Sequence, residues 1–357
     1  MCRPALNSFF PLLQSLQAEL RARTAWGDVA LVALADKGLA HHHVRLAGTG
    51  WLARIPKQSQ LGLEPQANLA HQQACFERAA ASGHTPRLSM ALPVSQRLPR
   101  GALLVEEIEG RAAVLPHDLP AIAQALAAVH ALSLPPAAGR PPLASSADPL
   151  RALYDEIDLQ ATHLPAAGVD AQVAAAIQHE LAVLRRLVAR PERPPCTLIA
   201  FDAHPGNFVV RASGQAVLVD LEKCRYAYPG LDLAHATLYT STTWDLTSQC
   251  ELGVQEVAGF YTTWSSAVGP DIAAAAQEWQ VPLRHAMWLW SLTWCCKWRA
   301  LSQRPPQPAA AGEDWSAANS DTALVAHVRD RVDHYLSPSA IALVLQELRS
   351  LQALFER

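Results

Sequence analysis

The residues between Leu198 and Val210 combine the side chains and the spacing that phosphate chemistry uses. Asp202 and Asn207 lie on a Pro-Gly loop between two short apolar runs, and Asp220 ends the next apolar run. Carboxylate and amide oxygens suit Mg²⁺, which proteins usually hold through one or two side chains together with substrate phosphates. The remaining carboxylate is free to accept a proton from a hydroxyl. The pattern therefore favours phosphoryl transfer, a reaction that depends on positioning and charge neutralisation.

Three short motifs carry a family resemblance: FDAHPGN at residues 201–207, VLVDLE at 217–222 and PGLDLA at 229–234. They resemble the aminoglycoside phosphotransferase and choline kinase superfamily, small-molecule relatives of the protein kinases. The resemblance covers most of the chain, but its specific part is the block 197–238. It implies a protein-kinase-like bilobal fold, ATP and Mg²⁺ as cofactors, and a small-molecule hydroxyl as the phosphoryl acceptor.

The same resemblance implies a role for each polar residue of the block. Asp202 would be the catalytic base, and Asn207 and Asp220 would bind Mg²⁺. Asp232 would be a structural acid that steadies the loop. His130, at the end of the segment ALAAVH, matches a histidine that we expect to be structural.

The nucleotide site is also implied by position. Gly38 lies in the segment that corresponds to the nucleotide-covering hairpin. Arg54, in GWLARIP, matches the basic residue that contacts the α- and β-phosphates. Backbone groups of Glu106, Glu107 and Ile108 match the hinge that hydrogen-bonds adenine.

Two positions depart from the family pattern. The histidine that usually precedes the base by two positions is Ala200. The helix glutamate that usually pairs with the basic residue aligns with Gln72 or Gln73, with Glu77 as a substitute about one turn later. Lys57 is the alternative to the predicted phosphate-contacting arginine. These departures keep a second hypothesis open, a catalytically weak nucleotide-binding regulator of the pseudokinase type.

Apolar periodicity predicts the elements that position these residues. The first third of the chain reads as antiparallel strands around one helix, after a lead-in helix: helices 5–23 and 65–82, and strands 29–34, 43–46, 51–55 and 102–108. Later helices dominate, except for strands around the catalytic loop: 197–201, 208–211 and 216–221. The fold class is therefore α+β. We expect an N-terminal nucleotide-binding lobe over 1–107 and a helical C-terminal lobe over 108–357 that holds the catalytic loop and the acceptor site.

Composition and charge narrow the classes of function. Half of the 357 residues are hydrophobic and 17% are charged, so a large core can form without disulfides. The net charge of −3 gives no attraction for nucleic acid or anionic lipid. Seven scattered cysteines without a regular spacing indicate a reducing compartment. The apolar segment Ala286–Cys296 is too short to span a bilayer, so we expect a cytoplasmic protein with no membrane partner.

The acceptor is constrained only by charge and aromatic residues. Acids at Glu222, Asp245 and Glu251 follow the catalytic loop. Four tryptophans fall on one predicted helix: Trp288, Trp290, Trp294 and Trp298. Carboxylates and indole faces attract ammonium groups, which predicts a cationic amino alcohol or aminosugar. The alternative is that the acids are solvated and the tryptophans pack in the core.

Overall fold

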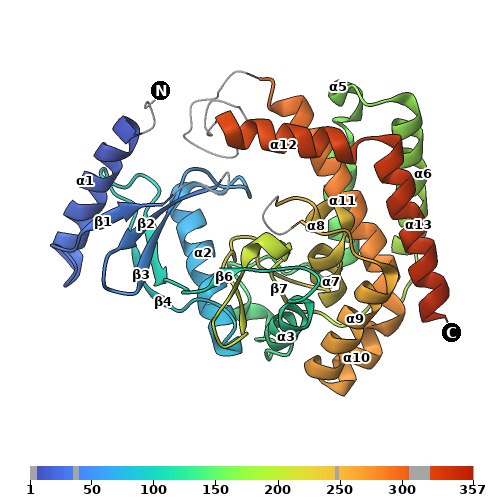
Figure 1. Ribbon diagram of the computed structural model, residues 1–357, viewed down its shortest axis with the longest axis horizontal. Helices are drawn as coiled ribbons and strands as arrows, with labels where there is room; N and C mark the ends of the chain where they lie inside the picture. The colour runs from blue at the N-terminus through green and yellow to red at the C-terminus, as the bar shows by residue number, and fades with distance from the viewer. Residues whose placement is uncertain (1–5, 35–39, 246–248, 305–321, 357) are drawn as a thin grey trace.

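The computed structural model describes residues 6–34, 40–245, 249–304 and 322–356 of the chain. Figure 1 shows an antiparallel sheet with two helices near the N-terminus, beside a larger and mostly helical part. This is the α+β bilobal architecture that the sequence predicts. The predicted nucleotide-covering residue Gly38 lies outside the described residues.

Five strands form the N-terminal sheet in the order β1-β2-β3-β5-β4, and every neighbouring pair is antiparallel. They are β1 (Leu31–Ala33), β2 (His41–Leu46), β3 (Trp51–Pro56), β4 (Leu88–Leu92) and β5 (Ala102–Glu106). The sequence prediction missed β4. Its residues, LSMAL, include no β-branched or aromatic side chain, so its extended conformation depends on pairing with β5.

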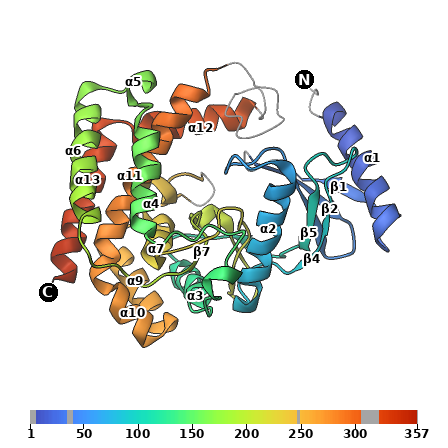
Figure 2. The same cartoon turned by 180° about the vertical axis from the view of Figure 1, so that it is seen from behind.

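Two helices cover opposite faces of this sheet, as Figures 1 and 2 show. Helix α1 (Leu6–Arg23) packs its buried leucines on one face, and α2 (Pro65–Ala79) packs Phe76 on the other. Strand β5 sends alternate side chains to the two faces, which explains its unbroken apolar run. Strand β3 lies between β2 and β5, so Arg54 is carried by an inner strand.

Helix α11 (Gln280–Leu301) is the central element of the helical part and packs against α4, α5, α6, α7, α12 and α13. The other helices are α3 (Leu119–His130), α4 (Pro149–Ala161), α5 (Leu164–Ala167), α6 (Ala171–Val188), α7 (Pro229–Thr237), α8 (Tyr239–Thr242), α9 (Val254–Val268), α10 (Pro270–Ala276), α12 (Thr322–Tyr335) and α13 (Pro338–Phe355). None of the helices in the described part of the chain is long and apolar enough to cross a membrane.

Two small sheets hold the loop that carries Asp202. Strand β7 (Thr197–Ile199) pairs with β10 (Arg225–Ala227), while β8 (Phe208–Val210) pairs with both β6 (Arg111–Ala112) and β9 (Ala216–Leu218). The three strands predicted here are confirmed, although each is shorter than expected. The sequence analysis missed β6 and β10, whose residues RA and RYA do not form an apolar run. Together these pairs fix both ends of the loop.

Candidate active site

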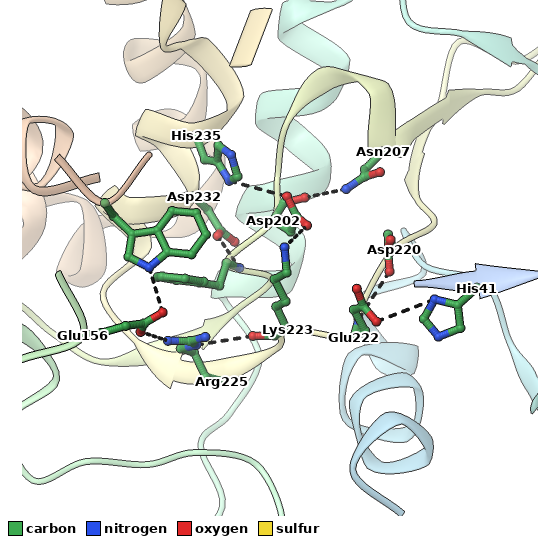
Figure 3. Close-up of polar contacts among 12 residues, drawn as sticks. His41, Glu156, Asp202, Asn207, Asp220, Glu222, Lys223, Arg225, Asp232 and His235 are labelled. Atoms are coloured by element: carbon green, nitrogen blue, oxygen red, sulfur yellow. Dashed lines mark hydrogen bonds and ion pairs between the residues drawn. The ribbon is translucent and has the colours of Figure 1, made fainter. Parts of the chain in front are cut away.

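The loop leaves β7 at Ile199 and is fixed by one buried carboxylate. Asp232, in the first turn of α7, accepts hydrogen bonds from the amides of Ala200 and Phe201 at 2.7 and 2.8 Å (Figure 3). Phe201 has a φ of +61°, a left-handed conformation that is costly for a residue other than glycine. The two bonds hold this turn in place. The predicted structural role of Asp232 is thus confirmed, and it operates although Ala200 replaces the loop histidine.

The carboxylate of Asp232 belongs to a fully buried network. His130 Nε2 lies 3.1 Å from Asp232 Oδ2, and Trp264 Nε1 donates to His130 Nδ1 at 2.9 Å. All three side chains are completely shielded from solvent. Because Nδ1 accepts from the indole, the imidazole proton is on Nε2 and is donated to the carboxylate. His130 is therefore part of the support beneath the loop, in agreement with the sequence prediction.

Asp202 lies above this support, facing a cation. Lys223 Nζ donates to Asp202 Oδ2 at 2.7 Å, and His235 Nδ1 lies 3.8 Å from Oδ1 (Figure 3). Burial alone would raise the pKa of Asp202, but the Lys223 ammonium lowers the pKa below the usual range for an aspartate. Burial lowers the pKa of His235 to about 4, so this imidazole is neutral. Asp202 is ionised, and its side chain is 16% exposed.

Asn207 and Asp220 come together on the adjoining hairpin. Asn207 Nδ2 donates to the backbone oxygen of Asp202 at 2.8 Å. The amide of Val219 donates to the backbone oxygen of Asn207 at 2.9 Å, so Asn207 lies beside the residue that precedes Asp220. The structure thus places both predicted metal ligands next to the predicted base. The Asp220 carboxylate is close enough to oppose the ionisation of Asp202.

Arg54 reaches this hairpin from the N-terminal sheet. Its Nη2 donates to Asp220 Oδ1 at 2.8 Å, and its Nη1 donates to the backbone oxygen of Val219 at 3.1 Å. Burial opposes the ionisation of Asp220, but the Arg54 guanidinium holds the pKa of that carboxyl well below its usual range. A residue predicted to contact phosphate and a residue predicted to bind Mg²⁺ therefore form an ion pair between the two parts of the molecule. The alternative, Lys57, lies beyond the end of β3.

The position of the missing helix acid is taken by Gln72, which does not touch Arg54. Gln72 Oε1 lies 2.9 Å from His41 Nε2, and His41 stands between the helix and the arginine. Glu77, the substitute suggested by the sequence, is exposed and accepts a hydrogen bond from Gln73. A direct ion pair between α2 and the basic residue is therefore absent among the described residues.

The three acids predicted to face an acceptor occupy different environments. Glu222 is buried, with Oε2 3.6 Å from His41 Nδ1 (Figure 3), and burial together with the Asp220 carboxylate raises the pKa of Glu222 to about 8. Asp245 lies against the catalytic loop, since a Cβ added at Gly206 would come within 3.1 Å of Asp245 Oδ2. Glu251 is exposed. Only Asp245 is placed to meet a molecule next to Asp202.

Three of the four tryptophans of α11 pack in the core. Trp288 and Trp298 are 1% and 4% exposed and pack in the helical core. Trp290 donates from Nε1 to Glu156 Oε1 at 2.8 Å, and Lys223 Nζ lies 6.0 Å from its ring centroid. The core interpretation holds for all three, and Trp290 also lies near the Asp202 ion pair through Lys223.

Trp294 is half-buried and belongs to an aromatic group near Asp245. Its ring centroid lies 5.9 Å from that of Trp244, which stacks on Tyr335 at 6.3 Å. Trp244 directly precedes Asp245 in the chain. Two half-buried indole rings are therefore packed together, and one of them directly precedes in the chain the acid that lies against the catalytic loop.

The predicted hinge residues follow β5. The amide of Glu106 donates to the backbone oxygen of Arg87, and that of Glu107 to the backbone oxygen of Gly50, both at 2.8 Å. Within the described residues, Ile108 is the one member of the predicted hinge whose amide makes no such bond. The structure thus narrows the set of amides that could meet a ligand at this place.

Lys223 was missed by the sequence analysis. It carries a polar group into the site three residues after Asp220, in the segment VLVDLEKC. A lysine so close to a predicted ligand was a usable signal. The run of three histidines from His41 to His43 is visible in the sequence, but the contacts of His41 with Gln72 and Arg54 are set by the register of the sheet and the placement of α2.

Solved structures of small-molecule kinases share this fold. A choline/ethanolamine kinase family protein from Mesorhizobium loti has a TM-score of 0.60 and 17% identity, over 95% of this chain and 99% of that one. An ethanolamine kinase from Plasmodium vivax has a TM-score of 0.61 and 12% identity, over 97% and 92%. The APH(2'')-IIa enzyme in complex with gentamicin has a TM-score of 0.55 and 10% identity, over 96% and 99%.

Comparison of the sequence matches fewer proteins than comparison of the fold does. No curated protein matches the chain significantly. The model of the phosphotransferase enzyme family, in contrast, matches residues 35–268, which include the N-terminal sheet from β2 onward, the catalytic loop and the Asp220 hairpin. The match covers more than half of the chain, and the protein therefore belongs to the phosphotransferase enzyme family.

Proposed function

We propose that this protein is an ATP-dependent kinase that transfers the γ-phosphoryl group of ATP to a hydroxyl group of a small molecule. The observation that carries the proposal is the pair of ionised carboxylates, Asp202 and Asp220, each held by one cation. In the proposed reaction the acceptor oxygen attacks the γ-phosphorus and the bond to the β–γ bridging oxygen breaks. Asp202 Oδ takes the hydroxyl proton, and ADP leaves.

The residues present fit a Mg²⁺ ion that arrives with the nucleotide. In the part of the chain that the structure describes, no group of three or more His, Cys, Asp or Glu side chains could hold a metal. The Asp220 carboxylate and the Asn207 side-chain oxygen would hold the ion, and phosphate oxygens and waters would supply its other ligands. When bound, the ion would neutralise the charge of the phosphates.

Arg54 supplies the second positive charge of the proposed nucleotide site. It now donates to Asp220, so a nucleotide would meet a guanidinium already aimed at the metal-binding carboxylate. Its planar group can bond to phosphate oxygens in pairs. The Ile108 amide, and backbone carbonyls of the segment Glu106–Ile108, would bond to adenine, since the Glu106 and Glu107 amides are engaged elsewhere. Contact by Gly38 stays a prediction from the sequence.

The acceptor is proposed to carry a positive charge. Asp245 lies against the catalytic loop, and the residue before it, Trp244, packs its half-buried ring against that of Trp294. An ammonium group is attracted by both a carboxylate and indole faces, with about 0.5–2 kcal/mol for each cation–π contact. A cationic amino alcohol or aminosugar held there would direct its hydroxyl toward Asp202. The structures of similar fold include a choline/ethanolamine kinase family protein and an aminoglycoside complex, which agrees with this class.

The decisive experiment measures ADP release by the purified chain with MgATP and a panel of hydroxyl compounds. The panel holds choline, ethanolamine, an aminoglycoside, a neutral sugar and an anionic hydroxy acid. We expect one of the cationic compounds to be phosphorylated. Phosphorylation of only neutral or anionic compounds contradicts the proposed acceptor class but leaves the kinase assignment intact.

Variants separate catalysis from binding. Asp202→Asn keeps the size of the side chain but removes the proton acceptor, and should lower kcat about 10²–10⁴-fold with nucleotide affinity within a few-fold. Asp155→Asn is the matched control, because Asp155 is exposed on α4 and pairs with Arg151. Near wild-type turnover in Asp202→Asn contradicts the assignment of the base. Nucleotide binding with no turnover on any compound favours the regulator hypothesis.

Trp294→Leu tests the acceptor site. If the ring contacts the acceptor, the KM of the acceptor rises about tenfold for each 1.4 kcal/mol lost, while the KM of ATP is unchanged. If the ring only packs, stability falls by about 1–3 kcal/mol and both KM values stay constant.

A further inference from the structure

A continuous chain of polar contacts links helix α2 to Asp220 through buried side chains. Gln72 Oε1 lies 2.9 Å from His41 Nε2, and His41 Nδ1 lies 3.3 Å from Arg54 Nη2. Arg54 then donates to Asp220 Oδ1 at 2.8 Å. The first three residues of this chain are 2%, 3% and 4% exposed, so water does not compete for the contacts.

The chemistry of the donors fixes the direction of the chain. Arginine carries donors and no acceptor, so His41 Nδ1 accepts from Arg54 Nη2 at 3.3 Å. Glu222 Oε2 lies 3.6 Å from the same nitrogen, beyond hydrogen-bond distance. The proton of the neutral imidazole is then on Nε2, and it is donated to Gln72 Oε1. A protonated imidazole would instead direct a donor at the guanidinium. The amide of Gln72 therefore fits this place, because it accepts a hydrogen bond without adding charge.

The register of the sheet explains why His41 can reach Arg54. His43 is the direct partner of Arg54 in the β2–β3 pair. His41 lies two residues before His43, so its side chain is on the same face and is the diagonal neighbour of Arg54. Gln72 is on the buried side of α2, which packs against that face.

We propose that His41 and Gln72 are positioning residues that set the place of the Arg54 guanidinium through a neutral hydrogen-bonded relay. The relay replaces the ion pair that an acid on the helix would make. Because the relay carries no charge, the whole positive charge of Arg54 is available to Asp220 and to the phosphates of a nucleotide. The effect on nucleotide phosphates rests on the proposed function, whereas the relay itself concerns contacts within the chain.

The first test reads the relay without nucleotide. Nitrogen-15 spectra of the full chain labelled at histidine should show His41 as the neutral tautomer with the proton on Nε2. His41→Phe identifies the resonance by its loss. A His41 ring that carries its proton on Nδ1 overturns the relay, because that nitrogen could no longer accept from Arg54.

The second test measures coupling between residues that do not touch. Gln72→Met and Arg54→Met are each expected to lower the urea midpoint, and the double variant should lower it by less than the sum. In the His41→Phe background this non-additivity should vanish. Strict additivity in the wild-type background overturns the relay and leaves three independent structural contacts.

The third test asks whether the relay serves the nucleotide site. Titration of MgADP by calorimetry should give a Kd about fivefold to tenfold higher for Gln72→Met than for the wild type, the size of one hydrogen bond. Gln73→Met is the matched control on the same helix, since the side chain of Gln73 donates to the exposed Glu77. Equal affinity in Gln72→Met and the wild type overturns the role in positioning. A wild-type chain that binds no MgADP overturns the proposed function instead, and the first two tests still decide the relay.

Discussion

Two aspartates only 30 residues apart, Asp202 and Asp232, are held in opposite ways. Asp232 is completely buried and accepts two backbone amides and one imidazole. Asp202 is partly exposed, and its carboxylate is held by Lys223 alone at hydrogen-bond distance among the described residues. A carboxylate whose lone pairs are filled by the backbone cannot exchange partners without moving the loop. A carboxylate held by one flexible side chain can exchange that partner for a ligand while the loop stays in place.

Asp232 therefore supports the catalytic loop, whereas Asp202 is free to interact with a ligand. The network beneath the loop, Asp232 with His130 and Trp264, fixes where the turn lies. The residues above the loop offer charge that can be redirected toward a ligand. Asp220 belongs with Asp202 in this respect, because its cation, Arg54, comes from the other part of the molecule.

The largest expected effect tests the support. Asp232→Ala leaves two buried amides and an imidazole without their acceptor, so unfolding free energy should fall by about 3–5 kcal/mol. Asp202→Ala removes one partner of a partly exposed ion pair and should cost less, about 1–3 kcal/mol. Urea denaturation of the two variants measures both numbers. Equal losses would remove the distinction between the two aspartates.

The second-largest expected effect concerns Lys223, the cation that holds Asp202. Lys223→Met keeps the aliphatic stem of the lysine but removes the ammonium that orients and ionises Asp202. We expect kcat for the accepted compound to fall about 10–100-fold, with nucleotide affinity little changed. Lys223→Arg restores a donor and should recover part of the rate. A loss of stability without a loss of kcat would place Lys223 with the support instead.

The sequence predicted the parts of this comparison unequally. The spacing of Asp202, Asn207 and Asp220 is local to one loop and one hairpin, so a motif of a few residues contains it. Strands with alternating or continuous apolar runs were predicted for the same reason. The contact of Asp232 with the loop was available only through the family resemblance.

The missing predictions depend on tertiary arrangement. Strand β4 is set by its partner β5, because its own residues have little tendency to extend. The contact between Gln72 and His41 joins residues 31 positions apart on a helix and a strand. The family pattern predicts a helix residue paired directly with Arg54. In the structure the His41 imidazole lies between Gln72 and Arg54. No local pattern encodes such a placement.

A smaller effect tests how much the hydrogen bond from Trp264 contributes to the buried network of Asp232 and His130. Trp264→Phe keeps the ring in the core but removes the donor to His130 Nδ1. A buried acceptor without its partner costs about 1–2 kcal/mol of unfolding free energy. Nucleotide affinity should not change, because the ring is remote from Arg54 and Asp220. A change in kcat larger than the change in stability would mean that the network also tunes Asp202.

The smallest effect extends the comparison to an aspartate of intermediate character. Asp118, before α3, accepts from the Arg111 guanidinium and from the amide of Val114, and His117 Nδ1 lies 2.8 Å from its Oδ1, so it has two side-chain partners and one backbone partner. The Arg111 hydrogen bond, with the Val114 amide, holds the pKa of Asp118 well below its usual range. A depressed folded-state pKa stabilises the fold above the pKa of the unfolded chain, near 4, and this stabilisation is lost as the pH falls toward the folded value.

Asp118→Asn keeps an oxygen that can accept from the Val114 amide, so it should lower the urea midpoint at pH 7 by less than Trp264→Phe does. Below about pH 4 the difference from the wild type should shrink, because the wild-type carboxyl then takes up a proton on unfolding. A difference that stays constant from pH 7 to pH 3 would show that the Val114 bond, which an asparagine oxygen can keep, matters and the charge does not.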